Sequence, residues 1–385
     1  MSDKSKLHEQ FGFLLEKSGK IEKAIVHYRK ALQCSSGGDA DFDARLHFRL
    51  GNLLARENDD IAARTHYAFA LSLRSDMAEA WHNIGTVYLK HGCNDCALSC
   101  FMEALSIRRD YPDANFNVAT ALRRLNRQAE AVRFSWNAIL DRSKNVSRRP
   151  DAIDCSSTTS SSCDENLTVV CVKWGTKYDS EYVLKLFRGV RRHLRLDHEF
   201  VCFTDDNTGL RDVKGITIRN LSEIGWTGWW NKATLFSKSA RLSGRVMYVD
   251  LDTVIVSSLD SLVSFRGLFA TLGTDDFKNE GRSGGLNSSV MLWNASSSEI
   301  LGIFERLQKC SPAIMKQCIH RFDHWLEMNL TNVPRLQSLF PGLFVEYAQH
   351  CTSSGFPSRA AVINFPLEPK PHSVKSLVWM KEHWV

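Results

Sequence analysis

Small and large apolar residues recur at a fixed spacing in the first third of the chain. Gly51, Gly85 and Ala119 stand 34 residues apart, and Gly12 precedes Gly51 by 39. The third copy shows the pattern most fully, with Trp81, Ile84, Gly85, Tyr88, Ala97, Phe101 and Ala104. Small residues let two helices approach closely, and large residues fill the space between neighbouring hairpins. We therefore predict four stacked helical hairpins over residues 1–145.

The period identifies the kind of repeat. Thirty-four residues is the length of the tetratricopeptide repeat, a helix–turn–helix unit, and the spacing of Trp81, Gly85 and Tyr88 resembles its pattern. One hairpin cannot bury its apolar face alone, so at least three must stack. The resemblance implies a groove for peptides or partner proteins and no chemistry of its own.

Residues 146–166 separate this array from the rest of the chain. Ser and Thr dominate the segment, and its apolar periodicity disappears. Such composition favours a flexible tether between two domains, either a passive spacer or a phosphorylated stretch.

From Leu167 the pattern alternates between strand-like and helix-like segments. Strands are predicted at 167–172, 199–203, 216–218 and 246–249, with helices at 179–194 and 230–242. Alternation of this kind predicts an α/β domain with a largely parallel sheet over residues 167–385. The whole chain is therefore expected to be α plus α/β.

Composition narrows the class of protein. The chain has 385 residues, 43% of them hydrophobic and 24% charged, with a net charge of +6. These values suit two or three globular domains. No long run of basic residues stands out, so no nucleic-acid partner is expected.

The termini and cysteines indicate a location. The first nine residues are polar, unlike a signal peptide, and no apolar run is long enough to span a membrane. The eleven cysteines form no compact paired pattern. We therefore expect a cytoplasmic protein with reduced thiols and no membrane span.

Carboxylates gather where predicted strands end. Asp250 and Asp252 follow the strand at 246–249, and Asp205 follows the strand at 199–203. Ligands of α/β sheets bind at the carboxyl ends of strands. Side chains at i and i+2 point the same way, so Asp250 and Asp252 can aim at one hard divalent cation. Either aspartate could instead cap a turn.

The second domain resembles GT-A glycosyltransferases of the glycogenin and bacterial galactosyltransferase type. The resemblance runs through ordered motifs over most of residues 167–385. These are Lys173–Tyr178, Tyr248–Asp252, Leu286–Leu292, Phe322–Leu326, and Val362–Phe365 followed by Lys370-Pro371. It implies a Rossmann-like fold that transfers a hexose-type sugar from a UDP-linked nucleotide-sugar donor with Mn²⁺ or Mg²⁺.

The resemblance also implies residue roles. Asp250 and Asp252 would hold the metal, Tyr178 would stack on uracil, and Lys370 would grip the diphosphate. Asn287 would line the sugar pocket and Asp323 would lie near the reacting carbon. Asp205 and Lys232 are further candidates for donor binding, Lys232 because the start of a helix suits phosphate.

The sequence departs from the family pattern at the metal site. The family's metal-binding His is Asn364 here, and His372 is a substitute candidate for the third ligand. Leu367 stands where the family has a flexible Gly, and His324 follows Asp323 where the family has Gln. These changes leave the third ligand, and whether the anomeric configuration is retained, undetermined.

Each candidate also has a structural alternative. Asn287 could be an ordinary strand terminus, Asp323 a helix N-terminal carboxylate, Tyr178 a packing residue and Lys370 a solvated loop charge. The Trp226–Trp230 segment could form a sugar-stacking lid or belong to the core.

The sequence therefore allows two functions. The first is a metal-dependent glycosyltransferase whose protein, peptide or glycan acceptor is selected by the repeats. The second is an inactive repeat scaffold with a degenerate nucleotide-sugar-binding domain.

Overall fold

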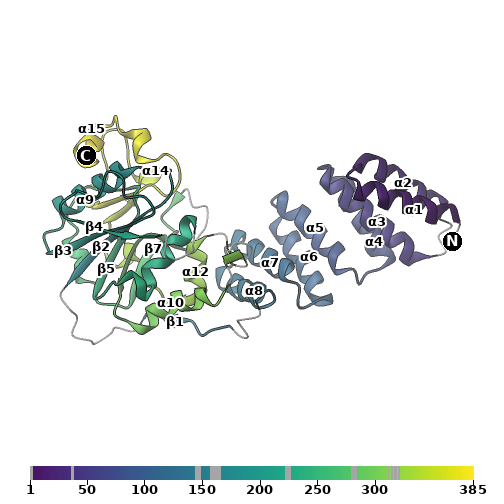
Figure 1. The fold of residues 1–385 in the computed structure, drawn as a ribbon, viewed down its shortest axis with the longest axis horizontal. Helices are drawn as coiled ribbons and strands as arrows, with labels where there is room; N and C mark the ends of the chain where they lie inside the picture. The colour runs from purple at the N-terminus through teal and green to yellow at the C-terminus, as the bar shows by residue number, and fades with distance from the viewer. Residues whose placement is uncertain are drawn as a thin grey trace. The chain divides into compact units, whose positions relative to one another are not determined.

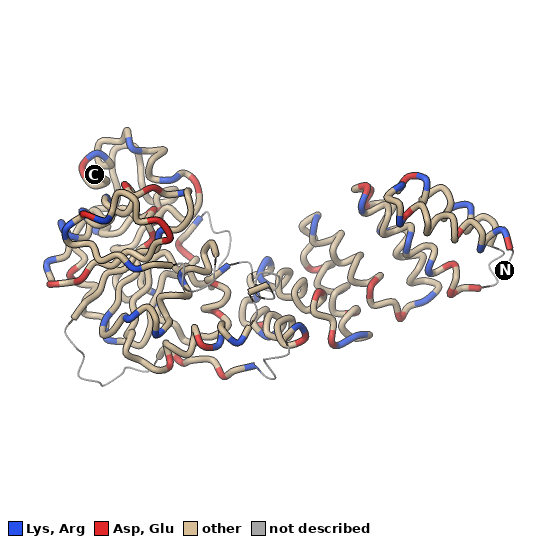
Figure 2. Tube along the Cα trace, in the orientation of Figure 1, with Lys and Arg blue, Asp and Glu red and all other residues tan. Residues whose placement is uncertain are grey.

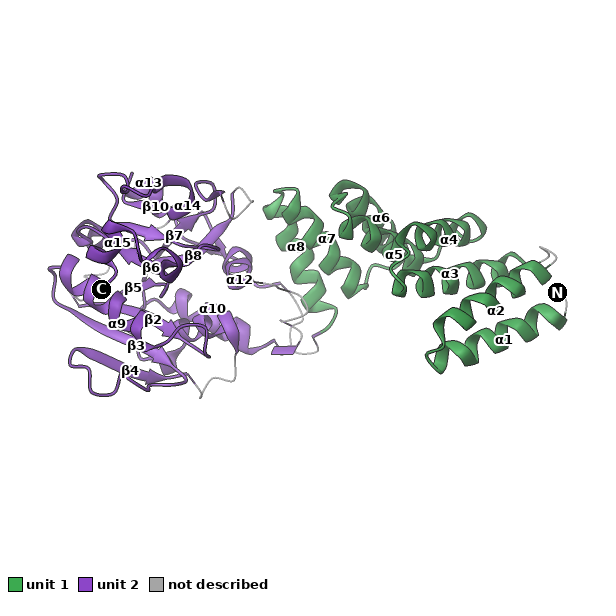
Figure 3. Ribbon diagram, turned by 90° about the horizontal axis from the view of Figure 1, so that it is seen from above, with its two compact units in different colours: residues 1–142 green, residues 143–385 purple. Residues whose placement is uncertain are grey.

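A computed structural model describes residues 3–385 except 36–38, 144–148, 157–165, 222–226, 279–283, 311, 314, 316–318 and 320. The chain divides into two compact units, residues 1–142 and 143–385 (Figure 3). The first unit is helical and the second combines strands with helices. Each unit is described by itself below.

The first unit consists of helices joined by short turns (Figure 1). Consecutive helices pair as hairpins: α1 with α2, α3 with α4, α5 with α6, and α7 with α8. Their bounds are α1 Asp3–Lys17, α2 Ile21–Cys34, α3 Ala40–Arg56, α4 Asp60–Leu73, α5 Ala78–Lys90, α6 Asn94–Ile107, α7 Pro112–Arg124 and α8 Gln128–Leu140. The prediction of helical hairpins is confirmed.

Glycine lets the two helices of a hairpin approach closely. A Cβ added at Gly51 would lie 2.5 Å from the Tyr67 ring, and one at Gly85 would lie 2.6 Å from the Phe101 ring. Such distances are too short for non-bonded atoms, so the ring occupies the space that a side chain would need. In the fourth repeat Ala119 replaces the glycine, and the position that holds the ring elsewhere is Ser135.

The second unit is built on a six-stranded sheet with the order β4-β3-β2-β5-β8-β7. The strands are β2 Leu167–Lys173, β3 His198–Thr204, β4 Ile216–Asn220, β5 Arg245–Val249, β7 Phe269–Gly273 and β8 Leu286–Asn294. The four strands β2 to β5 are parallel, whereas β8 runs antiparallel to both β5 and β7. The predicted strands are present, and the sheet is largely parallel as predicted, with β8 as its antiparallel strand.

Both faces of this sheet are covered. Val169 and Cys171 of β2 belong to a core shared with helix α9, Ser180–His193. Trp293 of β8 points to the other face, since it follows Leu292 of that core by one residue. There Phe236 packs on Trp293 with ring centroids 5.1 Å apart. Burial on both faces explains why the central strands are almost continuously apolar.

Two smaller sheets complete the unit. One joins β10 Phe344–Glu346, β11 Val362–Asn364 and β6 Thr253–Ile255. The other pairs β1 Ile153–Asp154 with β9 Leu330–Thr331. Among the described residues of this unit, the other α-helices are α10 Ser298–Gln308, α12 Phe322–Asn329, α13 Leu336–Leu339, α14 Tyr347–His350 and α15 Val378–His383.

Strand β1 corrects part of the prediction that residues 146–166 form a flexible tether, of which 146–148 and 157–165 lie outside the described residues. Ile153 and Cys155 are buried, and the Cys155 N–H donates to the Thr331 carbonyl at 3.0 Å. This segment therefore belongs to the second unit, since it pairs with residues about 180 positions later in the chain.

The predicted helix at 230–242 is also wrong. The segment forms two 3₁₀ helices, Gly228–Phe236 and Lys238–Ala240, separated at Ser237 by extended backbone. Every residue from Trp230 to Phe236 is buried. With all sides covered, apolar spacing carries no helical period from which the element type could be read.

Acidic and basic residues are interspersed along the trace of both units (Figure 2). Among the described residues, no helix is long and apolar enough to cross a membrane.

Candidate active site

A cavity of about 360 Å³ lies at the carboxyl edge of the main sheet. Val172 near the end of β2 and Leu251 just beyond β5 contribute to its wall. Because β8 runs antiparallel to β5, its first residues, including Asn287, come to the same edge. The full lining is Val172, Trp174, Lys177, Tyr178, Trp229, Lys232, Asp250, Leu251, Asp252, Asn287, Ser288, Ser289, Arg321, Phe322, Asp323, Pro366, Leu367 and Lys370.

This cavity brings together seven of the residues singled out from sequence. They are Tyr178, Lys232, Asp250, Asp252, Asn287, Asp323 and Lys370. The seven come from segments spread over almost 200 positions of the chain. Their convergence is a property of the sheet topology, which places the relevant strand ends at one edge.

Asp250 is held by a lysine and a tyrosine. Its Oδ2 accepts a hydrogen bond from Lys232 Nζ at 2.9 Å, and its Oδ1 accepts one from the Tyr248 hydroxyl. Its backbone N–H donates to the Ser289 carbonyl at 2.8 Å, which anchors the strand end to β8. Burial raises the pKa of Asp250, and the Lys232 ammonium opposes that rise.

Asp252 has a second lysine and tyrosine. Its Oδ2 accepts from Lys370 Nζ at 2.7 Å and from the Tyr178 hydroxyl at 2.8 Å. Lys370 Nζ also donates to the Phe365 carbonyl at 2.7 Å. Burial, together with the Asp252 charge, holds the pKa of Tyr178 well above its ordinary value, so the phenol keeps its proton.

Charges of both signs face the cavity. Lys177, Lys232, Arg321 and Lys370 line it, against three carboxylates, Asp250, Asp252 and Asp323. The lysines at Asp250 and Asp252 are nearly buried, with side-chain exposures of 9% and 6%. Nearly buried ammonium groups next to a cavity suit a polyanionic ligand such as a diphosphate.

Asp323 and Asn287 bracket a short backbone segment. Asp323 Oδ1 accepts from the Ser288 N–H, and Asn287 Oδ1 accepts from the Ser289 N–H, both at 2.9 Å. Asp323 lies in the first turn of α12, and Asn287 near the start of β8. Both therefore have a structural contact and also face the cavity.

Three predicted site residues lie elsewhere. The Asp205 carboxylate accepts from the Gly175 N–H at 2.9 Å and is not part of the cavity wall. Asn364 is fully buried in β11, where its side-chain amide donates to the Val345 carbonyl. His372 is exposed, and its ring nitrogen Nδ1 forms a hydrogen bond with the Tyr182 hydroxyl. Asp205 was predicted from its place after a strand, Asn364 from its motif position and His372 from its place near Lys370, and none of these fixes the direction of a side chain.

The donor atoms at the cavity fit a hard divalent cation in part. Asp250 and Asp252 both face the cavity, and carboxylate oxygens are preferred ligands of Mg²⁺ and Mn²⁺. Neither Asn364 nor His372 lines it, and no group of three or more His, Cys, Asp or Glu side chains within the described ranges is arranged as a metal site. Two carboxylates are nevertheless a usual protein contribution for Mg²⁺, since phosphate oxygens and water complete its shell.

Several cavity residues were not predicted. Trp174, Lys177 and Arg321 were missed, although Trp174 and Lys177 lie within a motif and Arg321 directly precedes one. The tryptophans of the 226–230 segment have different environments. Trp229 lines the cavity and is 43% exposed, whereas Trp230 is buried against Phe322. Trp226 is outside the described residues.

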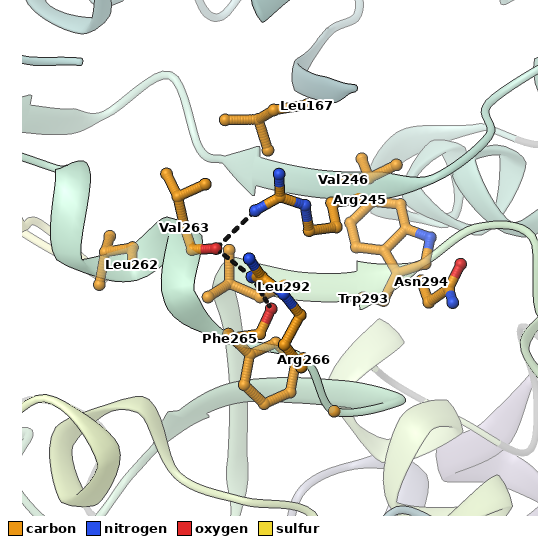
Figure 4. A pocket seen from close by; sticks show the side chains of 11 residues that line it. Leu167, Arg245, Val246, Leu262, Val263, Phe265, Arg266, Leu292, Trp293 and Asn294 are labelled. Carbon is orange, nitrogen blue, oxygen red and sulfur yellow. Dashed lines mark hydrogen bonds between the residues drawn. The ribbon is translucent and has the colours of Figure 1, made fainter. Parts of the chain in front are cut away.

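A second hollow lies at the opposite edge of the sheet, beside Leu167, Arg245 and Asn294 (Figure 4). Arg245 and Arg266 both donate to the Val263 carbonyl there. Its volume is about 20 Å³, enough for a single water and too small for a substrate.

Comparisons with known proteins concern the repeats. The tetratricopeptide-repeat family profile matches residues 78–111. Human (Homo sapiens) tetratricopeptide repeat protein 7A is 30% identical over 107 residues, which are 28% of this chain and 12% of that protein. Solved structures with similarity include MamA, at 21% identity and a TM-score of 0.33 over 36% of this chain and 78% of that one. Another is the first TPR of Spaghetti (RPAP3) bound to the HSP90 peptide SRMEEVD, at 17% identity and a TM-score of 0.30 over 32% and 95%.

The family match falls on α5 and α6 and the turn before α7, the hairpin whose sequence pattern is fullest. The helical unit is therefore an array of tetratricopeptide repeats, as its 34-residue period predicts.

Proposed function

We propose that the second unit transfers a sugar from a nucleotide-sugar donor, of the UDP-hexose type, to an acceptor recruited by the repeats. The observation that carries this proposal is the cavity at the carboxyl edge of the sheet, where two carboxylates and two nearly buried lysines meet. Six of the seven residues, all except Lys232, belong to the motifs of the resemblance, and their convergence on this cavity supports it.

Lys232 and Lys370 would bind the diphosphate of the donor. Each ammonium lies within 3 Å of an aspartate oxygen and at the cavity wall, so a small shift of the flexible side chain would reach a phosphate oxygen. Cations at this place stabilise the negative charge that moves onto the leaving diphosphate as the glycosidic bond breaks.

Asp250 and Asp252 would hold Mn²⁺ or Mg²⁺, with phosphate oxygens and water as further ligands. The ion would supply Lewis-acid stabilisation of the leaving group. Tyr248 and Tyr178 keep the two carboxylates oriented through their hydroxyl groups. Tyr178 and Trp174, which also line the cavity, would pack against the base of the donor.

Asp323 and Asn287 would position the sugar ring. Both face the cavity, and their links to the Ser288-Ser289 backbone hold them in place. Retention of configuration requires no general base on the acceptor, so Asp323 would orient the sugar or stabilise charge. Proton NMR of the first product reports the anomer, and an inverted product would assign Asp323 the general-base role.

The experiment that tests the activity is a panel of nucleotide sugars assayed for hydrolysis by the full chain. Hydrolysis of one donor, dependent on Mn²⁺ and lost with excess chelator, is expected. The proposal fails if two results are both negative. These are that UDP plus Mn²⁺ does not stabilise the protein against heat, and that the protein releases no nucleotide from any donor.

The acceptor is assigned to the repeats, because stacked hairpins offer a binding surface and no catalytic group. A fragment 149–385, which keeps β1 with the unit it pairs with, should retain donor hydrolysis and lose transfer to a protein or peptide acceptor. Unchanged acceptor kinetics would assign the repeats another role.

One observation favours a catalytically inactive scaffold as the second candidate. Asp250 and Asp252 each already have an ammonium partner, and neither proposed third ligand reaches the cavity. In that case the repeats alone would carry the function, as a protein-interaction scaffold. The thermal response to UDP plus Mn²⁺ separates the two candidates.

A further inference from the structure

Histidine pairs bridge the helices of the first two repeats. His8 of α1 faces His27 of α2, with 3.3 Å between their Nδ1 atoms. His47 of α3 faces His66 of α4, with 2.9 Å between theirs. Both pairs span 19 residues, and the second lies 39 residues after the first, which is also the interval from Gly12 to Gly51. The pairs therefore occupy the same repeat position.

The position explains why the rings meet. Each first histidine stands four residues, about one helical turn, before the glycine at which the two helices approach closely. The third and fourth repeats hold Trp81 with Cys100 and Asn115 with Phe134 at the equivalent positions. The feature is thus confined to the first two repeats and is not part of the repeat pattern itself.

The nitrogen–nitrogen distances are those of hydrogen bonds between two imidazole rings, and they also equal the separation of two nitrogens bound to one metal ion. With a metal–nitrogen bond of about 2.05 Å, a separation of 3.3 Å corresponds to an N–M–N angle of about 107°, close to tetrahedral. A separation of 2.9 Å corresponds to about 90°, the angle between neighbouring ligands in square-planar or octahedral shells.

The protonation state also suits a metal. Burial lowers the pKa of His27, His47 and His66, so their neutral forms, which bind metals, are favoured at neutral pH. The charged neighbours are Lys30 at His27, Asp43 at His47 and Arg29 at His66. Phe69 lies 5.1 Å from His47, and Phe11 lies 5.6 Å from His27, between ring centroids, which gives each pair an apolar flank.

We propose that each histidine pair is a bidentate site for a divalent transition-metal ion of the Zn²⁺, Ni²⁺ or Cu²⁺ class, with water completing the shell. No third His, Cys, Asp or Glu side chain joins either pair in the described part of the chain. Binding is therefore weaker than at a four-ligand structural zinc site. A bound ion ties the two helices of its hairpin together and stabilises the folded repeats by mass action.

Zinc titration of the tag-free full chain by calorimetry tests the proposal. The variants are His27→Gln, His66→Gln and the double variant, since Gln keeps hydrogen bonding and removes the imidazole. His91→Gln is the matched control, because His91 is an exposed repeat histidine whose ring pairs with Asp60. Each single variant should bind one Zn²⁺ fewer than the wild type and the double variant two fewer, with the control unchanged.

Other zinc-binding groups, such as Cys93, Cys96 and the Asp250–Asp252 pair, remain in every variant, so their contribution cancels in the difference. A double variant with wild-type stoichiometry would overturn the proposal. A second measurement needs no variant: electron paramagnetic resonance of bound Cu²⁺ should show hyperfine coupling to two imidazole nitrogens per ion. A spectrum with no such pair of nitrogens would also overturn it.

Discussion

The two units of this chain build their polar contacts over very different sequence distances. In the repeats, His47 and His66 meet across 19 residues and Tyr67 reaches Asn52 across 15. In the cavity, Tyr178 reaches Asp252 across 74 residues and Lys370 reaches it across 118. A repeat therefore carries its own determinants, whereas each cavity side chain depends on the whole α/β fold. A substitution in the repeats should act locally, and one in the cavity should affect both stability and function.

Asp252→Asn should have the largest effect. It leaves the ammonium of Lys370, which is 6% exposed, without its carboxylate partner. Breaking a buried ion pair on one side costs about 3–5 kcal/mol. Denaturant unfolding should show that loss in the second unit, along with loss of donor turnover.

The double variant Asp252→Asn with Lys370→Met is the control, because it removes the unpaired charge as well. It should recover most of the stability and none of the activity. A single variant as stable as the wild type would mean that Lys370 does not depend on Asp252.

Lys370→Ala should lower the reaction rate as well as the stability, because it leaves Asp252, which is 13% exposed, with the Tyr178 hydroxyl and without its ammonium partner. Removing one group that stabilises transition-state charge typically lowers kcat by about 10²–10³. Donor KM should change much less, since the charge on the leaving group develops in the transition state. Steady-state kinetics of donor hydrolysis measures both constants. Lys375→Ala, at an exposed lysine of the same segment, should behave as wild type.

Adding one methyl group at a glycine should have opposite effects in the two units. Gly51→Ala forces the Tyr67 ring to shift and should destabilise the repeats by about 1–3 kcal/mol. Gly302→Ala in α10 meets nothing within 4 Å and should stabilise its helix by about 0.5–1 kcal/mol. Thermal unfolding of the full chain compares the two. If Gly51→Ala is neutral, the close approach does not constrain the hairpin.

Acid should lower the stability of the repeats through the histidine pairs. The effect should be smaller than those of the substitutions above, because the histidine rings are half-buried. Burial lowers the pKa of His66 from 6.5 to about 4, so between these values the unfolded chain binds more protons than the folded one. The stabilisation is complete above pH 6.5 and is lost as the pH falls toward 4. In the presence of chelator, the pH dependence of urea unfolding should be shallower in the variant with His27→Gln and His66→Gln. An equal slope would mean that these rings do not titrate with folding.

The repeats could be predicted from the sequence because the residues that define each hairpin lie close together in the chain. The spacing of Gly12, Gly51 and Gly85 predicts the hairpins, and the same spacing fixes where Tyr28, Tyr67 and Phe101 pack. What the spacing did not indicate was the contact between histidines, since a half-buried His in a helix has no distinctive pattern in sequence.

Prediction in the second unit succeeded for strands and for motif residues that immediately follow them. Asp250 and Asp252, which follow β5, line the cavity, whereas Asp205, which follows β3, accepts from Gly175 outside its wall. The side chains of Asn364 and His372 turn to Val345 and Tyr182. A position at a strand end or in a motif fixes a residue's place in the fold, and the direction of its side chain depends on its partners.

The sequence by itself determined the 34-residue helical repeat, the main strands and the chemical types at the strand ends, because these follow from spacing and local propensity. Only the tertiary structure decided which ammonium pairs with which carboxylate, that 230–242 is not an α-helix, and that Ile153 joins Leu330. Those outcomes depend on contacts between residues far apart in the chain, whose free energy of burial and pairing outweighs any local preference.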